Sequence, residues 1–90
     1  MAIVFRRSAA RHGISTERAT FVIETCPCPL YAPDEDVGQR DHVMFLGPDA
    51  DGVPLEVVGI ELEDGDLVVI HAMRMRSRFS AAYVQVMQCQ

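Results

Sequence analysis

Three arginines recur at every second position after an apolar run, in the segment VVIHAMRMRSRF. The three are Arg74, Arg76 and Arg78. A guanidinium group binds phosphate through parallel hydrogen bonds, and histidine, of which the chain has three, exchanges protons near neutral pH. Histidine and arginine together are typical of sites that bind or cleave a phosphodiester. The alternative is that the arginines form ion pairs with the acidic residues of the preceding hairpin, which lie in the segment from Glu61 to Asp66.

The charge of the chain is distributed unevenly. Its 90 residues carry a net charge of −5, but residues 1–33 carry +2, residues 34–66 carry −10 and residues 67–90 carry +3. If the two ends of the chain pack together, they form a basic surface on an acidic body. The residues alone therefore leave two interpretations of the three arginines open, phosphate binding and internal ion pairing.

Length and composition indicate one folded domain that spans residues 1–90. Hydrophobic residues make up 49% of the chain and charged residues 23%, which is typical of a globular protein. No apolar run approaches the ~20 residues that cross a membrane, so we expect no membrane association. The N-terminal apolar patch precedes its arginines, whereas a secretory signal has the opposite order. We therefore predict a cytoplasmic protein.

The three cysteines, Cys26, Cys28 and Cys89, match no familiar metal-site or disulfide pattern. Zinc sites need paired cysteines or histidines at matching spacing, and the histidines of this chain are scattered. We therefore predict no metal and no cofactor. An odd number of cysteines argues against a disulfide framework, so we expect reduced, partly buried thiols.

The N-terminal third of the chain predicts two helices and an edge strand. Residues 6–12 can form a short helix that ends at Gly13. Ser15 is a suitable N-cap for a second helix, which ends before Pro27. The apolar residues of this helix recur at helical spacing, and they are Ala19, Val22, Ile23 and Cys26. The segment CPLYAP is expected to be an edge strand because prolines bracket it.

The rest of the chain predicts a small antiparallel sheet. Residues 32–41 include a charged loop that we expect to be mobile or ordered by a partner. Three apolar segments follow, HVMFLG, VPLEVVGIEL and LVVIHAM, and the turn sequences PDADG and EDGD separate them. We expect residues 68–73 to be a central strand paired antiparallel with residues 55–62.

The side chains of that central strand are expected to alternate between two faces. Val69, His71 and Met73 then share one face, so His71 is expected to be packed and hydrogen-bonded. After the strand, residues 77–88 carry apolar and aromatic side chains at helical spacing. The predicted fold class is therefore α+β, with two N-terminal helices, a small antiparallel sheet of three or four strands and one C-terminal helix.

The order of these elements resembles the BrnT family, the ribonuclease toxins of type II toxin–antitoxin systems with a RelE-like fold. RHGIS stands where the family has a basic–His–Gly–Val–Ser motif at the end of its first helix. HVMFLGPDADG resembles its glycine-ended strand and turn, and PLEVVGI resembles its Leu- and Val-rich strand. VVIHAMRMRSRFSAAY resembles the strand that leads into a basic helix. The resemblance covers residues 6–83.

The resemblance implies a cluster of basic residues that carries the chemistry. Catalysis is assigned to His42, Arg74 and Arg76, and RNA binding to Arg11, His12, Arg78 and Tyr83. We expect the three C-terminal arginines to form an anion-binding rim beside His42, to which Arg11 contributes. His12 can instead cap the first helix, and Tyr83 can belong to the core. The chain departs from the family where His42 and Met73 stand in place of arginines.

The function implied by the resemblance is metal-independent cleavage of RNA by a toxin that a cognate antitoxin protein neutralises. A homodimer and a heterotetramer with the antitoxin both agree with this expectation. The chain also departs from the family in its terminal helix, which has almost no charged residues after Arg78. These departures thin the basic surface. The alternative is therefore a non-catalytic interaction module of the same fold, which binds a protein partner.

Overall fold

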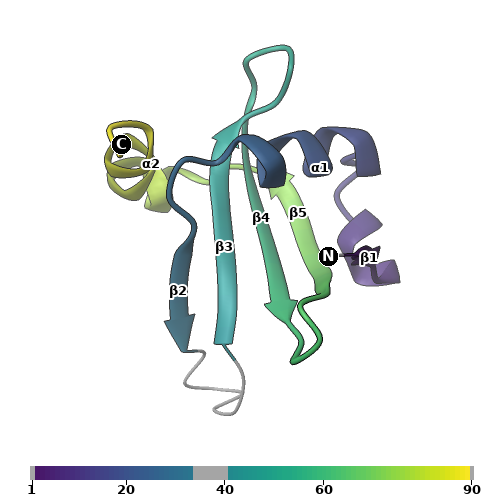
Figure 1. Ribbon diagram of the computed structural model, residues 1–90. Coiled ribbons are helices and arrows are strands. Elements are labelled where there is room, and N and C mark those ends of the chain that lie inside the picture. The colour runs from purple at the N-terminus through teal and green to yellow at the C-terminus, as the bar shows by residue number, and fades with distance from the viewer. Residues whose placement is uncertain (1, 34–40, 90) are drawn as a thin grey trace.

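A mixed β-sheet is the centre of the structure, a computed structural model that describes residues 2–33 and 41–89 (Figure 1). Within these ranges the sheet has five strands, in the order β1-β5-β4-β3-β2. The strands are β1 (Ile3–Phe5), β2 (Leu30–Pro33), β3 (Asp41–Pro48), β4 (Pro54–Glu61) and β5 (Leu67–Arg74). The helices are α1 (Thr16–Thr25) and α2 (Ser80–Met87), and the 3₁₀ turns are η1 (Arg7–Ala10) and η2 (Ser77–Phe79).

The antiparallel part of the sheet agrees with the prediction from sequence. Strands β2 to β5 pair antiparallel in chain order, and β2 lies at one edge as expected. The predicted central strand lies within β5, between β4 and β1, and pairs antiparallel with β4. The turn at EDGD closes this hairpin, where Gly65 adopts a φ of 89° that favours glycine. The α+β class is confirmed. Residues 34–40 of the expected mobile segment 32–41 lie outside the described residues. The ends of that segment, Ala32, Pro33 and Asp41, are instead paired in β2 and β3.

The N-terminal segment differs from the prediction in two ways. Residues 3–5 form β1, which pairs in parallel with β5 and makes the sheet mixed. The expected first helix is only the 3₁₀ turn η1, so the layout with two N-terminal α-helices is not found. Hydrogen bonds to β5 hold this segment extended up to Arg6, whose N–H donates to the carbonyl of Val69 at 2.9 Å. The Ser8 hydroxyl then donates to the carbonyl of Ile70 at 2.8 Å, which fixes η1 against β5.

Helix α1 forms where the sequence predicts it. The Ser15 hydroxyl accepts the backbone N–H of Arg18 at 3.2 Å, which satisfies one of the free donors of the first turn. Arg18 also extends from α1 to the turn between β3 and β4, where its Nε donates to Asp49 at 2.8 Å. The backbone N–H of Val53, together with Arg18 and another turn amide, holds the pKa of Asp49 below its ordinary value despite burial. This carboxylate therefore organises the turn and fastens it to the helix.

A β-bulge in β5 changes the predicted alternation of side chains. Val58 of β4 lies opposite His71, but the next residue, Gly59, lies opposite Val69. Ile70 is therefore an extra residue in β5, and it shifts the period of two by one position. Val69 and His71 consequently point to opposite faces of the sheet. The prediction that they share a face is wrong for this reason.

The two faces of the sheet have different partners. The first face packs against α1 and carries the main core. Its buried strand residues are Val43, Phe45, Leu55, Val57, Leu67, Val69 and Ala72. The second face carries the side chains that alternate with these, among them Leu46, Glu56 and His71.

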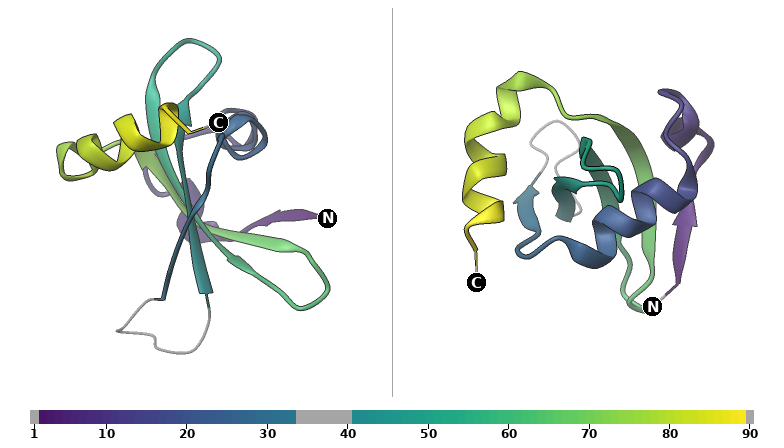
Figure 2. Two further views of the ribbon diagram at one scale, coloured as in Figure 1. Left: turned by 60° about the vertical axis from the view of Figure 1, so that its left-hand side comes forward. Right: turned by 90° about the horizontal axis from the view of Figure 1, so that it is seen from above.

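Helix α2 lies beside the part of β3 that extends beyond β2. The last β2–β3 pair is Leu30 with Met44, and Figure 1 shows α2 next to the remaining end of β3. Leu46 and Val86 are both buried but lie outside the main core. Figure 2 shows α1 and α2 on different sides of the sheet. None of the described helices is long and apolar enough to cross a membrane.

The cysteines contradict the prediction of reduced thiols. Cys28, in the connection between α1 and β2, forms a disulfide with Cys89, which follows α2, with the Cα atoms 6.1 Å apart. Cys26 is the free cysteine, and it is half-buried. The odd count misled the prediction because one thiol packs against the core while the other two meet through the fold. The disulfide closes a loop of 61 residues and ties α2 to the rest of the chain.

Reduction of this disulfide is expected to destabilise the protein. For a loop of 61 residues, the chain-entropy model gives a loss of about 4 kcal/mol. We expect the melting temperature to fall by roughly 10 °C or more on reduction or in the Cys89→Ser variant. Cys26→Ser is the matched control, because it removes a thiol and leaves the disulfide intact. Equal melting temperatures of the oxidised and reduced proteins would contradict the expectation.

The bulge leaves no space for a side chain at Gly59. A Cβ atom built there lies 2.7 Å from Cδ1 of Leu67 and 3.2 Å from the carbonyl oxygen of Val68. We therefore expect Gly59→Ala to destabilise the protein by about 1–3 kcal/mol through overpacking, measured by denaturant titration. Gly47→Ala is the control, since its nearest contact is an ordinary 3.6 Å to Val22. An equally small effect of both substitutions would show that the bulge relaxes freely.

Candidate functional site

A buried carboxylate, Glu56, lies on the second face of the sheet. Its side chain has no exposed surface, and its neighbours along β4, Leu55 and Val57, are apolar and buried. Its cross-strand neighbours are Leu46 on β3 and Met73 on β5. An unpaired carboxylate in such surroundings costs a large amount of free energy, so its partners are part of the fold.

Two side chains and one backbone amide donate to Glu56. The Arg76 guanidinium donates to Oε1 through Nε at 3.0 Å and Nη2 at 2.6 Å. Its backbone N–H donates to Oε2 at 3.0 Å. Nε2 of His71 lies 2.9 Å from Oε1. The ladder with β4 continues as far as Met75, whose N–H donates to the carbonyl of Pro54, and Arg76 follows directly after it.

These donors keep Glu56 ionised. Burial alone would raise the pKa of Glu56, but hydrogen bonds from the side chain and backbone of Arg76, and from His71, outweigh burial and lower the pKa below its ordinary value. Arg76 is nevertheless 45% exposed, and His71 is 25% exposed. The buried carboxylate therefore holds a cation and an imidazole at the surface.

His12 brings a second imidazole to this place. It follows η1, and its ring lies edge-on to the ring of His71 with 5.5 Å between centroids. Gly13, with a φ of 75°, turns the chain directly after it. His12 is exposed. Two histidines from opposite ends of the sequence therefore meet beside Arg76.

An aromatic ring lies at the other side of Arg76. The guanidinium carbon of Arg76 is 5.6 Å from the centroid of the Phe79 ring, and that of Arg78 is 4.7 Å away. Both distances fall within the range of cation–π attraction. We refer to Glu56, His71, Arg76 and His12, together with Arg78 and Phe79, as the His–Arg site.

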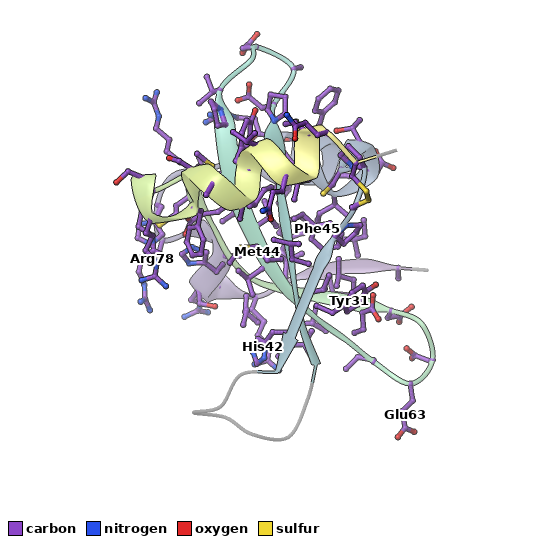
Figure 3. All side chains as sticks on the ribbon, turned by 90° about the vertical axis from the view of Figure 1, so that its left-hand side faces the viewer. Tyr31, His42, Met44, Phe45, Glu63 and Arg78 are labelled. Atoms are coloured by element: carbon purple, nitrogen blue, oxygen red, sulfur yellow. A yellow bond between two sulfur atoms is a disulfide. The ribbon has the colours of Figure 1, made fainter. Side chains whose placement is uncertain are left out.

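His42 does not belong to the His–Arg site, contrary to the prediction. His42 lies at the end of β3 that pairs with Ala32 and Ile60. Gly47 lies at the other end of β3, opposite Leu55, which directly precedes Glu56 in β4. These two positions of β3 are about 16 Å apart at ~3.3 Å per residue. Figure 3 shows His42 near one end of β3 and Arg78 near the start of α2. The predicted rim beside His42 is therefore not formed.

The other predicted site residues are divided between different surfaces. Arg74 lies opposite Leu55, so it belongs to the first face and is separate from Arg76. Arg11 is exposed and directly precedes His12. Tyr83 is half-buried on α2, where the described contacts do not link it to the His–Arg site. Of the seven predicted residues, His12, Arg76 and Arg78 come together.

Sequence analysis missed Glu56 and underrated His71. The signal for Glu56 was a single acid between apolar residues in PLEVVGI, a segment treated as uniformly apolar. An acid inside a doubly covered strand needs a cation, and an arginine can bind one carboxylate through two of its donors. The expectation that His71 is packed and hydrogen-bonded is confirmed. The internal partner of Arg76 is Glu56, not an acid of the hairpin between β4 and β5.

Neither metal-binding clusters nor known relatives identify the site. Among the residues that the structure describes, no three His, Cys, Asp or Glu side chains are grouped to hold a metal ion. Comparisons of the chain with protein-family models, characterised proteins and solved structures find no match. The resemblance to the BrnT family therefore stays a prediction, and the function is inferred from the geometry of the His–Arg site.

The lowered pKa of Glu56 predicts how stability depends on pH. The unfolded chain binds a proton at Glu56 near the ordinary pKa, and the folded chain only at lower pH. The stabilisation is therefore complete above the ordinary value and is lost as the pH falls through the folded pKa. We expect Glu56→Gln to cost about 2–3 kcal/mol at pH 7, and the difference from the wild type to shrink in acid.

Denaturant titrations between pH 3 and pH 8 measure this effect. Glu63→Gln is the control, because it removes the same charge from an exposed position in the hairpin. A constant difference between Glu56→Gln and wild type across this range would show that the ionised carboxylate is not the source of stability.

Proposed function

We propose that the chain is a toxin-like ribonuclease, similar to the BrnT family, and that the His–Arg site cleaves RNA. The observation that carries this proposal is the meeting of His12 and His71 beside an arginine that a buried carboxylate holds in place. Cleavage of RNA by its own 2′-hydroxyl needs a base, an acid and a cation at the phosphate. The His–Arg site contains candidates for all three roles, and the proposed reaction uses no metal ion.

His71 serves as the general base in this proposal. Its Nε2–H donates to Glu56, so the neutral ring has its lone pair on Nδ1. Nδ1 takes the proton of the 2′-hydroxyl as that oxygen attacks phosphorus. Glu56 fixes the ring orientation and stabilises the imidazolium that forms, and so acts as a positioning residue.

His12 serves as the general acid, and Arg76 stabilises the phosphate. The protonated ring of His12 gives its proton to the departing 5′-oxygen as the P–O bond breaks. The products are a 2′,3′-cyclic phosphate and a 5′-hydroxyl end. Arg76, half-exposed while bonded to Glu56, donates to the phosphate oxygens as negative charge increases on them. Arg78 adds positive charge on the same side.

The proposal includes a RelE-like fold and a cognate antitoxin as its partner. The small sheet with helices on both sides supports such a fold at the level of its class only. A basic surface that binds RNA is also a suitable target for an acidic antitoxin segment. A homodimer and a heterotetramer with the antitoxin are both compatible with this arrangement.

The alternative function, a non-catalytic interaction module, is favoured by one observation. The Nε and Nη2 donors of Arg76 are used on Glu56, as expected for an arginine with a structural role. In that case the two histidines only cover the ion pair. The two functions predict different results for the purified protein, because only the ribonuclease cleaves RNA.

Cleavage of a short single-stranded RNA in the presence of EDTA tests the proposal. We expect cyclic-phosphate products from the wild type and a loss of rate of about 10²–10⁴-fold in His71→Ala and in His12→Ala. His42→Ala is the matched control and should keep its rate, because His42 lies at the far end of β3. An intact RNA with the folded wild-type protein, or equal rates for all three variants, would leave the interaction module as the better account.

A further inference from the structure

The guanidinium of Arg78 lies over the ring of Phe79 at the edge of the His–Arg site. The guanidinium carbon is 4.7 Å from the ring centroid, close enough for direct contact between the two groups. Phe79 is half-buried and Arg78 is exposed, so the arginine covers the ring on the solvent side. Figure 3 shows Arg78 at the outside of the molecule, near the start of α2.

Arg78 has no acidic partner among the described residues. The last acidic residue of the chain is Asp66, and in the described part of the chain no carboxylate forms an ion pair with Arg78. The residue also stands just before the first turn of α2, where a cation opposes the helix dipole and no side chain caps the helix. Within residues 2–33 and 41–89, no carboxylate therefore explains the position of Arg78, and its described contact is with the ring of Phe79.

We propose that Arg78 and Phe79 form a stacking subsite for an unpaired nucleobase, and that the substrate is accordingly single-stranded RNA. The proposal rests on the ribonuclease function and specifies its substrate class. A guanidinium plane or an aromatic ring stacks on any base, but only on a base that has left a duplex. Arg76 contacts both Phe79 and Glu56, so it joins this subsite to the histidine pair.

The subsite separates recognition of the base from recognition of the phosphate. A lysine at position 78 keeps the charge but has no planar group to stack. Arg78→Lys should therefore retain phosphate attraction and lose base stacking. Phe79→Leu keeps an apolar side chain behind the arginine and removes the ring. The control is Arg74→Lys, which makes the same chemical change on the first face of the sheet.

Binding to a short, fluorescein-labelled RNA with 2′-O-methyl riboses tests the subsite, because this RNA cannot be cleaved. We expect Arg78→Lys and Phe79→Leu to weaken binding about tenfold, and Arg74→Lys to leave it unchanged. An oligomer with abasic sugars should bind the wild type and Arg78→Lys equally. The duplex form should bind the wild type more weakly than the single strand. Circular dichroism verifies that each variant is folded.

The possible failures of this experiment are distinguishable. If the wild type binds and cleaves RNA but Arg78→Lys binds the single strand as tightly as wild type, the subsite is wrong and the proposed function stands. The subsite is also wrong if Arg78→Lys weakens binding of the abasic oligomer as much as binding of the normal single strand. In that case Arg78 contacts only the phosphate. If the single strand binds through stacking but is not cleaved, the subsite stands and catalysis fails. If the folded wild type binds no RNA, both proposals fail.

Discussion

A carboxylate removed from water stays ionised only when donors inside the fold replace the water. In this chain Glu56 is that carboxylate, and the donors come from Arg76 and His71. The ladder between β4 and β5 continues to Met75, and Arg76 then binds Glu56 on the second face. The ion pair therefore anchors the segment that leads into η2 and α2. Helix α2 lies beside the end of β3 that β2 does not cover, and the disulfide between Cys28 and Cys89 fixes its far end (Figure 1).

The bulge in β5 is the second requirement of the same interaction. Without the bulge, in a regular ladder that also paired Ile70, His71 would share the first face with Val69 and point into the apolar core under α1. With it, the imidazole lies on the second face within reach of Glu56. The bulge also requires glycine at position 59, because the side chain of Leu67 occupies the space beside it. A local irregularity of the backbone therefore decides which chemistry the strand presents, as bulges next to functional sites commonly do.

Periodicity and turn chemistry predicted most of the elements, because those signals are local. Helix α1, the antiparallel strands and the C-terminal helix all follow from apolar spacing, from Ser15 as a cap and from glycine turns. β1 was missed because three residues hold no period, and its strand character comes from the parallel pairing with β5. The site was predicted in part for the same reason. Arg76 and Arg78 are close in sequence to the strand end, but the partnership of His12 with His71 and of Cys28 with Cys89 exists only in three dimensions.

The energetics of the ion pair bear on the choice between the two functions. A buried ion pair is weak evidence for stability, since apolar residues of similar size often serve the fold as well or better. The neighbours of Glu56 on the second face, Leu46 and Met73, would accept a leucine at its position. What a leucine would not provide is a guanidinium and an imidazole held at fixed positions on the surface. An interaction module needs the cation alone, whereas RNA cleavage also needs the oriented ring of His71 and a second histidine beside it. The arrangement of Glu56, Arg76 and His71 therefore provides what the proposed RNA cleavage needs beyond a bound cation.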